Sequence, residues 1–242
     1  MGSPAFVHLT TFCDDVEYVG EPANHASLKA WFPESEIRVW SVNAVRQLML
    51  TRGDRVVLDA FDRLRPFAYK SDLASYYLLT TLGGWYTDLN NHFVAVPPET
   101  EEFSMVVFRD VLDVNAPWSI ATTLMWAAPN NVALNRAIEL VVGNCERRDY
   151  GRTPLGVTGP TLLGQAIGGV GLTPRTNYYT GMFYSSGPQK GLWTRDGELF
   201  ARYKPEALGP GESGVPGGNH YPSMWFAGEV YAGPHARAYR PA

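Results

Sequence analysis

Apolar and polar residues follow one another along the first sixty positions in blocks that predict strands and helices in turn. Residues 6–12 and 37–42 are rich in apolar and β-branched side chains, which is typical of buried strands. Residues 25–32 predict a short helix that ends before a proline, and residues 43–52 and 54–63 predict two further helices. This order predicts an α/β fold with a parallel or mixed sheet, whose ligands bind at the carboxyl ends of the strands.

The second half of the chain shows the same two patterns less regularly. Residues 103–109 predict another strand, residues 132–142 an amphipathic helix, and residues 161–167 a helix that begins after a Gly-Pro pair. Beyond residue 168 the pattern weakens. The segment 205–219 is dense in glycine and proline and predicts a long loop, which we interpret as a lid over a bound ligand, with a surface loop as the alternative.

Composition narrows the classes of function. The 242 residues carry a formal net charge of −4, and no stripe of lysine and arginine is visible, which argues against a nucleic-acid-binding protein. A ligand that carries phosphate is still compatible with this charge, because a bound divalent cation can supply the positive charge that the chain lacks.

The two cysteines and the apolar runs bear on the cellular location. Cys13 and Cys145 lie in unrelated contexts, so we expect neither a disulfide framework nor a cysteine zinc site, and a reducing compartment fits. No signal peptide is predicted, and no run reaches the roughly 18 apolar residues of a membrane span. We expect a soluble, cytoplasmic protein, with removal of a native leader or anchor as the open alternative.

The segment 69–96 carries the candidate chemistry. Ser71 is a candidate N-cap for a helix that has Asp72 in its first turn and ends at a glycine pair. A carboxylate in a first helical turn interacts favourably with the helix dipole, which is a purely structural explanation for Asp72.

A predicted strand, residues 85–96, follows the glycine pair. In an extended segment Asp88 and Asn90, two residues apart, would point to the same side. Carboxylate and amide oxygens suit Mg²⁺ or Mn²⁺ and leave coordination positions for a substrate diphosphate. The spacing by itself is equally typical of a solvated turn.

The same segment matches a longer pattern, S-D-x-x-R-x-x-x-L-x-x-x-G-G-x-Y-x-D-x-D. The matching residues are Ser71, Asp72, Leu79, Gly83, Gly84, Tyr86, Asp88 and, in place of the last Asp, Asn90. Further matches lie at Trp31-Phe32-Pro33, Arg38-Val39-Trp40, Thr158-Gly159-Pro160, Tyr221-Pro222 and His235. The chain thus resembles the DXD-motif glycosyltransferase family, which includes the yeast-type mannosyltransferases and, more distantly, the clostridial glucosylating toxins.

This resemblance implies a fold and an activity. The fold would be a single compact GT-A-like domain over residues 1–242, a Rossmann-like mixed sheet with flanking helices. Residues 1–92 would form its nucleotide-sugar half and residues 93–242 its acceptor half. The enzyme would be a metal-dependent hexosyltransferase that moves a sugar from a UDP- or GDP-sugar to an unidentified acceptor with retention of the anomeric configuration.

The resemblance also implies roles for individual residues. Asp88 and Asp72 would be catalytic, and Asp88, Asn90 and His235 would hold Mn²⁺ or Mg²⁺. Two further histidines are weaker metal candidates, His220 and His92.

Residues at the end of the first strand would bind the nucleotide. They are Thr10, Thr11 and Phe12. For Phe12, a place in the hydrophobic core is the alternative. Asp72 would accept hydrogen bonds from sugar hydroxyls, and Ser75 would lie beside the donor.

Two departures from the family pattern favour a competing, non-catalytic function. Ser75 stands where the pattern has an arginine, and Asn90 brings one negative charge fewer than aspartate. A non-catalytic relative that binds sugar nucleotides or glycans is therefore one alternative. A nucleotidyltransferase or nucleotide-sugar hydrolase with a similar nucleotide site is another.

Overall fold

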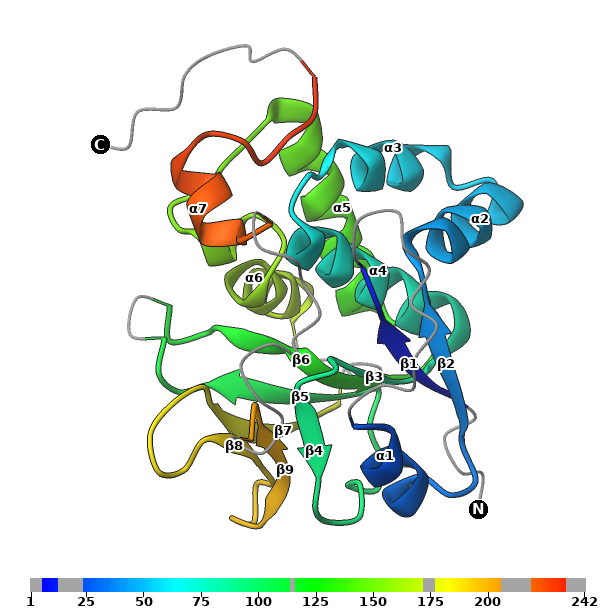
Figure 1. Ribbon diagram of the computed structural model, residues 1–242, viewed down its shortest axis with the longest axis vertical. Helices are drawn as coiled ribbons and strands as arrows, with labels where there is room; N and C mark the ends of the chain where they lie inside the picture. The colour runs from blue at the N-terminus through cyan, green and yellow to red at the C-terminus, as the bar shows by residue number, and fades with distance from the viewer. Residues whose placement is uncertain (1–5, 13–23, 114–115, 172–176, 206–218, 234–242) are drawn as a thin grey trace.

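A nine-stranded mixed sheet runs through the middle of the molecule (Figure 1). The computed structural model describes residues 6–12, 24–113, 116–171, 177–205 and 219–233. The strands lie in the order β2-β1-β3-β6-β5-β7-β8-β9-β4. Their bounds are β1 (Phe6–Thr10), β2 (Glu36–Trp40), β3 (Gly84–Thr87), β4 (Asn91–Phe93), β5 (Met105–Asp110), β6 (Ile120–Ala127), β7 (Tyr178–Tyr184), β8 (Gly191–Trp193) and β9 (Leu199–Tyr203).

Helices cover both faces of this sheet. Helices α2 to α6 lie together on one side, and α1 lies on the other side near β4 (Figure 1). The helical segments are α1 (His25–Trp31), α2 (Val42–Arg52), α3 (Arg55–Arg63), α4 (Phe67–Leu82), α5 (Val132–Arg147), a short 3-10 helix (Pro154–Gly156), α6 (Pro160–Val170) and α7 (Tyr221–Phe226). No helix within the described segments is long and apolar enough to cross a membrane.

Successive strand residues enter two different hydrophobic cores. In β5, Met105 and Val107 pack with residues of α2 to α6, whereas Val106 and Phe108 pack in a second core that contains Trp85. Neighbouring side chains of a strand point to opposite faces, so a strand that is apolar on both sides must be covered on both sides. The chain therefore folds as a single compact mixed α/β domain.

Most elements of the first two thirds agree with the sequence-based expectation. The mixed sheet is confirmed, because β1 runs parallel to β2 and β3 while β3 runs antiparallel to β6. Confirmed elements, with shifted ends, are the strands at 6–12, 37–42 and 103–109 and the helices at 25–32, 43–52, 54–63, 132–142 and 161–167. Strands β6 to β9 and helix α7 were not predicted. Most of the predicted loop 205–219 lies outside the described residues.

The division of the domain at residue 92 stays a prediction. That position falls inside β4, and β4 pairs with β9, which comes from the other proposed half of the chain.

The predicted start of the central helix is wrong. Helix α4 begins at Phe67, so Ser71 lies inside the helix and Asp72 lies beyond its first turn. The main-chain N–H of Phe67 donates to the side-chain oxygen of Asn219 at 2.6 Å. A residue 152 positions away thus satisfies an N-terminal N–H of the helix, a role that a local cap would otherwise take. The helix-dipole explanation for Asp72 no longer applies, because the dipole acts within the first turn.

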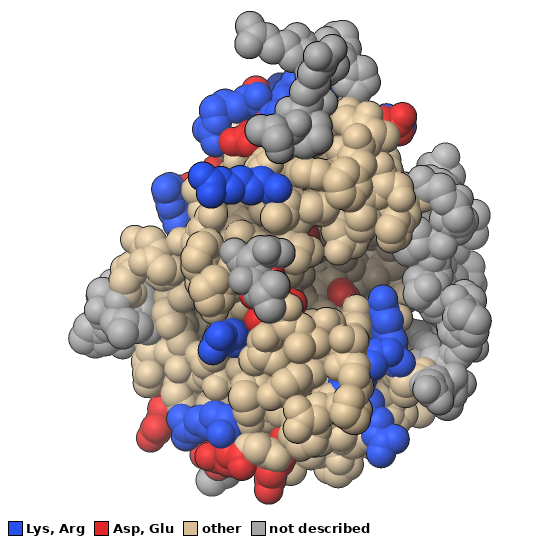
Figure 2. All heavy atoms as spheres, turned by 90° about the vertical axis from the view of Figure 1, so that its left-hand side faces the viewer, with Lys and Arg blue, Asp and Glu red and all other residues tan. Residues whose placement is uncertain are grey.

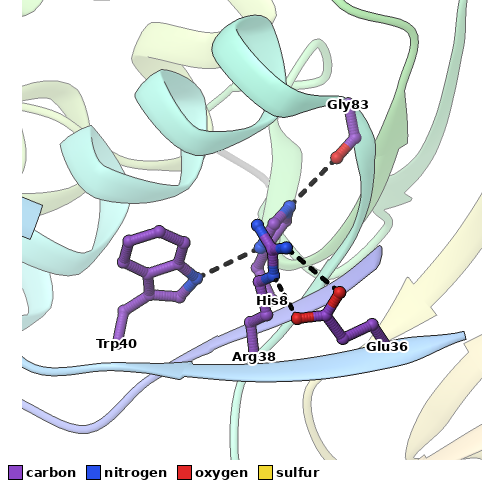
Figure 3. Close-up of polar contacts among 5 residues, drawn as sticks. All are labelled: His8, Glu36, Arg38, Trp40 and Gly83. Carbon is purple, nitrogen blue, oxygen red and sulfur yellow. Dashed lines mark hydrogen bonds and ion pairs between the residues drawn. The ribbon is translucent and has the colours of Figure 1, made fainter. Parts of the chain in front are cut away.

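A buried histidine ties β1, β2 and the end of α4 together (Figure 3). His8 is fully buried, its Nε2 lies 3.0 Å from the carbonyl oxygen of Gly83, and the indole N–H of Trp40 donates to its Nδ1 at 3.1 Å. Only the neutral ring with its proton on Nε2 makes both bonds. The pKa of His8 is lowered to about 4. Burial is the main cause, and the nearby Arg38 guanidinium acts in the same direction, while the bond to Gly83 and the Glu36 carboxylate oppose the shift.

The glycine pair after α4 lets β3 approach β1 closely. Gly83 and Gly84 have φ angles of 70° and 100°, which side chains rarely tolerate. A Cβ atom on Gly84 would lie 2.5 Å from the carbonyl oxygen of Phe6. Any side chain at this position would therefore push the two parallel strands apart.

Replacing Gly84 with alanine is expected to lower the free energy of unfolding by more than about 2 kcal/mol, because the methyl group meets rigid backbone at an unfavourable φ. The matched control is Gly168→Ala in α6, where an added Cβ has nothing within 4 Å. It should leave stability unchanged or raise it by up to about 1 kcal/mol through helix propensity. Urea unfolding of both variants checks the prediction, and equal effects would contradict the close approach.

Acid is expected to destabilise the fold through His8. Its folded pKa lies below the unfolded value of 6.5, so its stabilising contribution is present above pH 6.5 and is lost as the pH falls towards 4. At pH 4.5 the loss should be about 2 to 3 kcal/mol. A His8→Gln variant, neutral at both pH values, should be less stable than the parent at pH 7 but lose less between pH 7 and 4.5. Identical pH slopes in urea unfolding would refute this role.

Candidate functional site

A network of hydroxyls from β1, β3 and α4 reaches the Asp88 carboxylate through Tyr86. The phenol of Tyr86 donates to Asp88 Oδ1 at 2.8 Å. Its oxygen lies 3.0 Å from the hydroxyl of Thr10 and 2.8 Å from that of Ser71, and the last two hydroxyls also contact each other. Because the single phenolic proton points to Asp88, Tyr86 acts only as an acceptor towards Thr10 and Ser71. The network therefore orients the carboxylate from the sheet side.

Asp88 lies in a turn, so the prediction of one continuous strand over residues 85–96 is wrong. Strand β3 ends at Thr87 and β4 begins at Asn91, and the N–H of Asn91 donates to the carbonyl oxygen of Asp88 at 3.4 Å. Asp88 and Asn90 thus share a tight turn and are not neighbours on one face of a strand. The turn still carries both oxygen-bearing side chains in the short connection between the end of β3 and the start of β4.

Two buried amides hold this turn in place. Asn24 donates to the Asp88 carbonyl oxygen at 3.1 Å, and Asn91 donates to the Thr123 carbonyl oxygen at 2.8 Å and to hydroxyls of Thr123 and Thr87 at 3.1 Å. The main-chain N–H of Asp88 also donates to Thr123 at 2.8 Å. The turn is therefore fastened to β6 and to the start of α1.

Asp72 is the second carboxylate of the site. It lies in α4 and accepts a hydrogen bond from the Thr158 hydroxyl at 2.7 Å. Burial raises the pKa of the Asp72 carboxyl from 3.8 to about 7; the charge of Asp88 raises it as well, whereas hydrogen bonds from Thr158 and Thr122 lower it. A perturbed carboxyl with a charged neighbour is a common feature of functional sites.

The pKa of Asp88 is also raised. Burial raises its pKa, while hydrogen bonds from Tyr86 and Thr123 and the charge of Lys204 lower it. We call Asp72 and Asp88 the acidic pair. Because like charges disfavour each other in a partly dry site, the pair would be stabilised by a cation. Figure 2 shows a hollow in one face of the molecule with acidic side chains inside it and lysine or arginine around it.

The three residues predicted to bind the nucleotide at the end of the first strand lie in different surroundings. The Thr10 hydroxyl belongs to the network around Asp88. Thr11 is buried, and its main-chain N–H donates to Trp40 at 3.0 Å. Phe12 packs edge to face on Phe61, with ring centroids 5.8 Å apart, within the larger core. The geometry of Phe12 matches its alternative interpretation as a core residue.

Three further predicted site residues lie in different surroundings. Ser75 is fully buried, and its hydroxyl donates to the main-chain oxygen of Asp72 at 2.8 Å, so this side chain is not part of the group around Asp88. Asn90 is partly buried and follows Asp88 in the turn. His235 lies outside the described residues. The assignment of all these residues to a donor or a metal stays a prediction.

Sequence reasoning missed several residues of the site. Asn24, Asn91 and Thr123 hold the turn, but they come from the N-cap position of α1, from β4 and from β6, and nothing in the local pattern of any of them indicates the contact. Tyr86 and Thr158 were noticed only as parts of matched motifs. Their hydrogen bonds to the acidic pair give those motifs a physical meaning.

Comparison with known proteins supports the fold. No protein-family model matches the chain, and no curated protein matches it. Six chains among solved structures match, among them a structure described as PaToxG glycosyltransferase. That structure is 15% identical and has a TM-score of 0.50, and the match covers 68% of either chain. The chain therefore has a glycosyltransferase-like α/β fold.

Proposed function

We propose that the chain is a metal-dependent glycosyltransferase that moves a sugar from a nucleotide-diphosphate donor to an acceptor. The observation that carries the proposal is the acidic pair, with Asp88 just after the carboxyl end of β3 and Asp72 on α4, held by hydroxyls and a buried amide. Ligands of α/β sheets bind at this end of the strands. The likeness in fold to a glycosyltransferase structure is consistent with the same activity.

The residues present fit a divalent cation. Asp88 would supply a carboxylate oxygen and Asn90 an amide oxygen. Within the described segments no three His, Cys, Asp or Glu side chains come together as a metal cage. Mg²⁺ and Mn²⁺ accept such sparse protein ligation, because water and substrate phosphates fill the remaining positions. When bound, the cation would neutralise charge on the diphosphate.

The residues of the chain would orient the donor for the transfer. Tyr86 keeps the Asp88 carboxylate in one direction, and Asp72 would accept hydrogen bonds from hydroxyls of the donor sugar. In the proposed reaction the acceptor hydroxyl oxygen bonds to the anomeric carbon on the face from which the phosphate oxygen departs. The acceptor proton passes to the leaving phosphate. This path retains the configuration and forms no glycosyl-enzyme bond, so mass spectrometry of the working enzyme should find no such adduct.

Asp88→Asn is expected to lower sugar transfer at least about a hundredfold while leaving the melting temperature nearly unchanged, since it removes the charged metal ligand and keeps the shape of the side chain. Transfer and donor hydrolysis would be measured with UDP- and GDP-sugars and Mn²⁺. Chelation with EDTA should abolish activity, and added Mn²⁺ should restore it. The control is Asp59→Asn, an exposed aspartate in α3.

Three outcomes of that assay would contradict the proposal. Full activity of the Asp88 variant would exclude the site. A parent protein that binds donor without any turnover would be a non-catalytic binding relative. Products in which the diphosphate is made or cleaved would indicate a nucleotidyltransferase or nucleotide-sugar hydrolase.

Asp72→Asn is expected to stabilise the metal-free protein at alkaline pH. Folding raises the pKa of Asp72, so the stability that its proton provides is present below pH 4 and is lost as the pH rises through about 7. Asparagine never ionises. In EDTA, the melting temperature of the variant should exceed that of the parent at pH 8, by a margin that narrows at pH 5; an equal margin at both values would refute this account.

The same variant should affect donor use selectively. Its KM for the donor sugar nucleotide should rise, while its affinity for the free nucleoside diphosphate should stay the same, because the proposed contact is with sugar hydroxyls. Equal losses for both ligands would assign Asp72 a structural role.

A further inference from the structure

Two lysines meet around one tyrosine next to the turn that carries Asp88. Lys204 follows β9 and Lys190 precedes β8, and the ammonium of Lys190 donates to the main-chain oxygen of Lys204 at 3.0 Å. Their ammonium groups lie 5.1 Å and 5.8 Å from the ring centroid of Tyr203. We call Lys190, Tyr203 and Lys204 the lysine clamp.

The clamp is joined to the turn by main-chain bonds. Strand β4 pairs with β9 so that Asn91 is opposite Tyr203, and the N–H of Lys204 donates to the carbonyl oxygen of Asn90 at 2.7 Å. The main chain of Lys204 is therefore bonded directly to that of Asn90, the second proposed metal ligand.

Lys204 occupies an unusual backbone position. Its φ angle is 45°, in the left-handed region that glycine and asparagine adopt most easily. The side chain is exposed. The positive φ sets which substitutions this position tolerates without added backbone strain.

Neither ammonium forms an ion pair with a described residue. Across residues 6–12, 24–113, 116–171, 177–205 and 219–233, the ion pairs involve four arginines and no lysine. Two ammonium groups on one ring, next to the turn that carries Asp88, provide positive charge near the proposed metal site, where an anion could bind.

We propose that the lysine clamp binds the diphosphate of the nucleotide donor and takes over the positive charge that Ser75 cannot provide. This inference rests on the proposed function for the identity of the ligand. The two ammonium groups would contact phosphate oxygens of the donor, and Asp88 and Asn90 would hold the cation. Lysine binds phosphate as a point charge, so the contact contributes affinity for the diphosphate and little selectivity for the base or the sugar.

Lys204→Asn tests the clamp, because asparagine tolerates the left-handed backbone and carries no charge. The probes are UDP, GDP and inorganic pyrophosphate with Mn²⁺, and the nucleosides uridine and guanosine, measured by calorimetry. We expect affinity for the tighter-binding nucleoside diphosphate and for pyrophosphate to fall about ten- to a hundredfold, and nucleoside affinity to stay within twofold. Lys204→Arg should retain most of the affinity, and Lys190→Gln should weaken it by a smaller factor.

The control for the loss of one positive charge is Arg136→Gln, an exposed arginine of α5 that pairs with Glu139. It should leave diphosphate affinity unchanged. Parent-like affinity of the Lys204→Asn variant for diphosphates would overturn the clamp, as would an equal loss for nucleosides or a parent protein that binds no diphosphate. If the parent protein binds diphosphate through Lys204 but transfers no sugar, the proposed function is wrong and the proposal of the lysine clamp still holds.

Discussion

The close approach of β1 and β3 is the constraint on which the site depends. Gly84 allows it, since a side chain there would collide with the backbone of β1. The pairing sets His8 opposite Tyr86, and Thr10 two residues further along β1 then reaches the Tyr86 hydroxyl. Asp88, two residues beyond Tyr86, receives the phenolic hydrogen bond. A wider gap between the strands would break this chain of contacts at its first step.

The buried histidine reinforces the same approach from the side of α4. Its ring joins the carbonyl of Gly83 to the indole of Trp40 and so links the end of the helix to the first two strands. Because both bonds require the neutral ring, the arrangement favours a residue that stays uncharged at neutral pH. His8 is therefore a structural histidine, in spite of its place near the site.

The parts of the structure that sequence reasoning predicted are those that depend on local pattern. Helices such as α2, α3 and α5 follow from their own polar and apolar spacing, and the glycine pair marks the end of α4. The start of α4 was misplaced because Asn219, far away in the chain, binds its first N–H. For the acidic pair, the family pattern pointed to Asp72 and Asp88, but the asparagines and threonines that hold them come from other elements. Their contacts exist only after the sheet has formed.

The edge strand β4 brings a lysine that is distant in sequence next to the turn that carries Asp88. Strand β4 has three residues and begins directly after the turn that carries Asp88. Among the described strands it pairs with β9. That pairing carries Lys204 to Asn90, although more than a hundred residues separate them. Two carboxylates with raised pKa values disfavour their ionised forms until positive charge comes close. Lys204 directly follows β9 and Lys190 directly precedes β8, so the pairing of β4 with β9 brings both lysines next to the turn that follows Asp88.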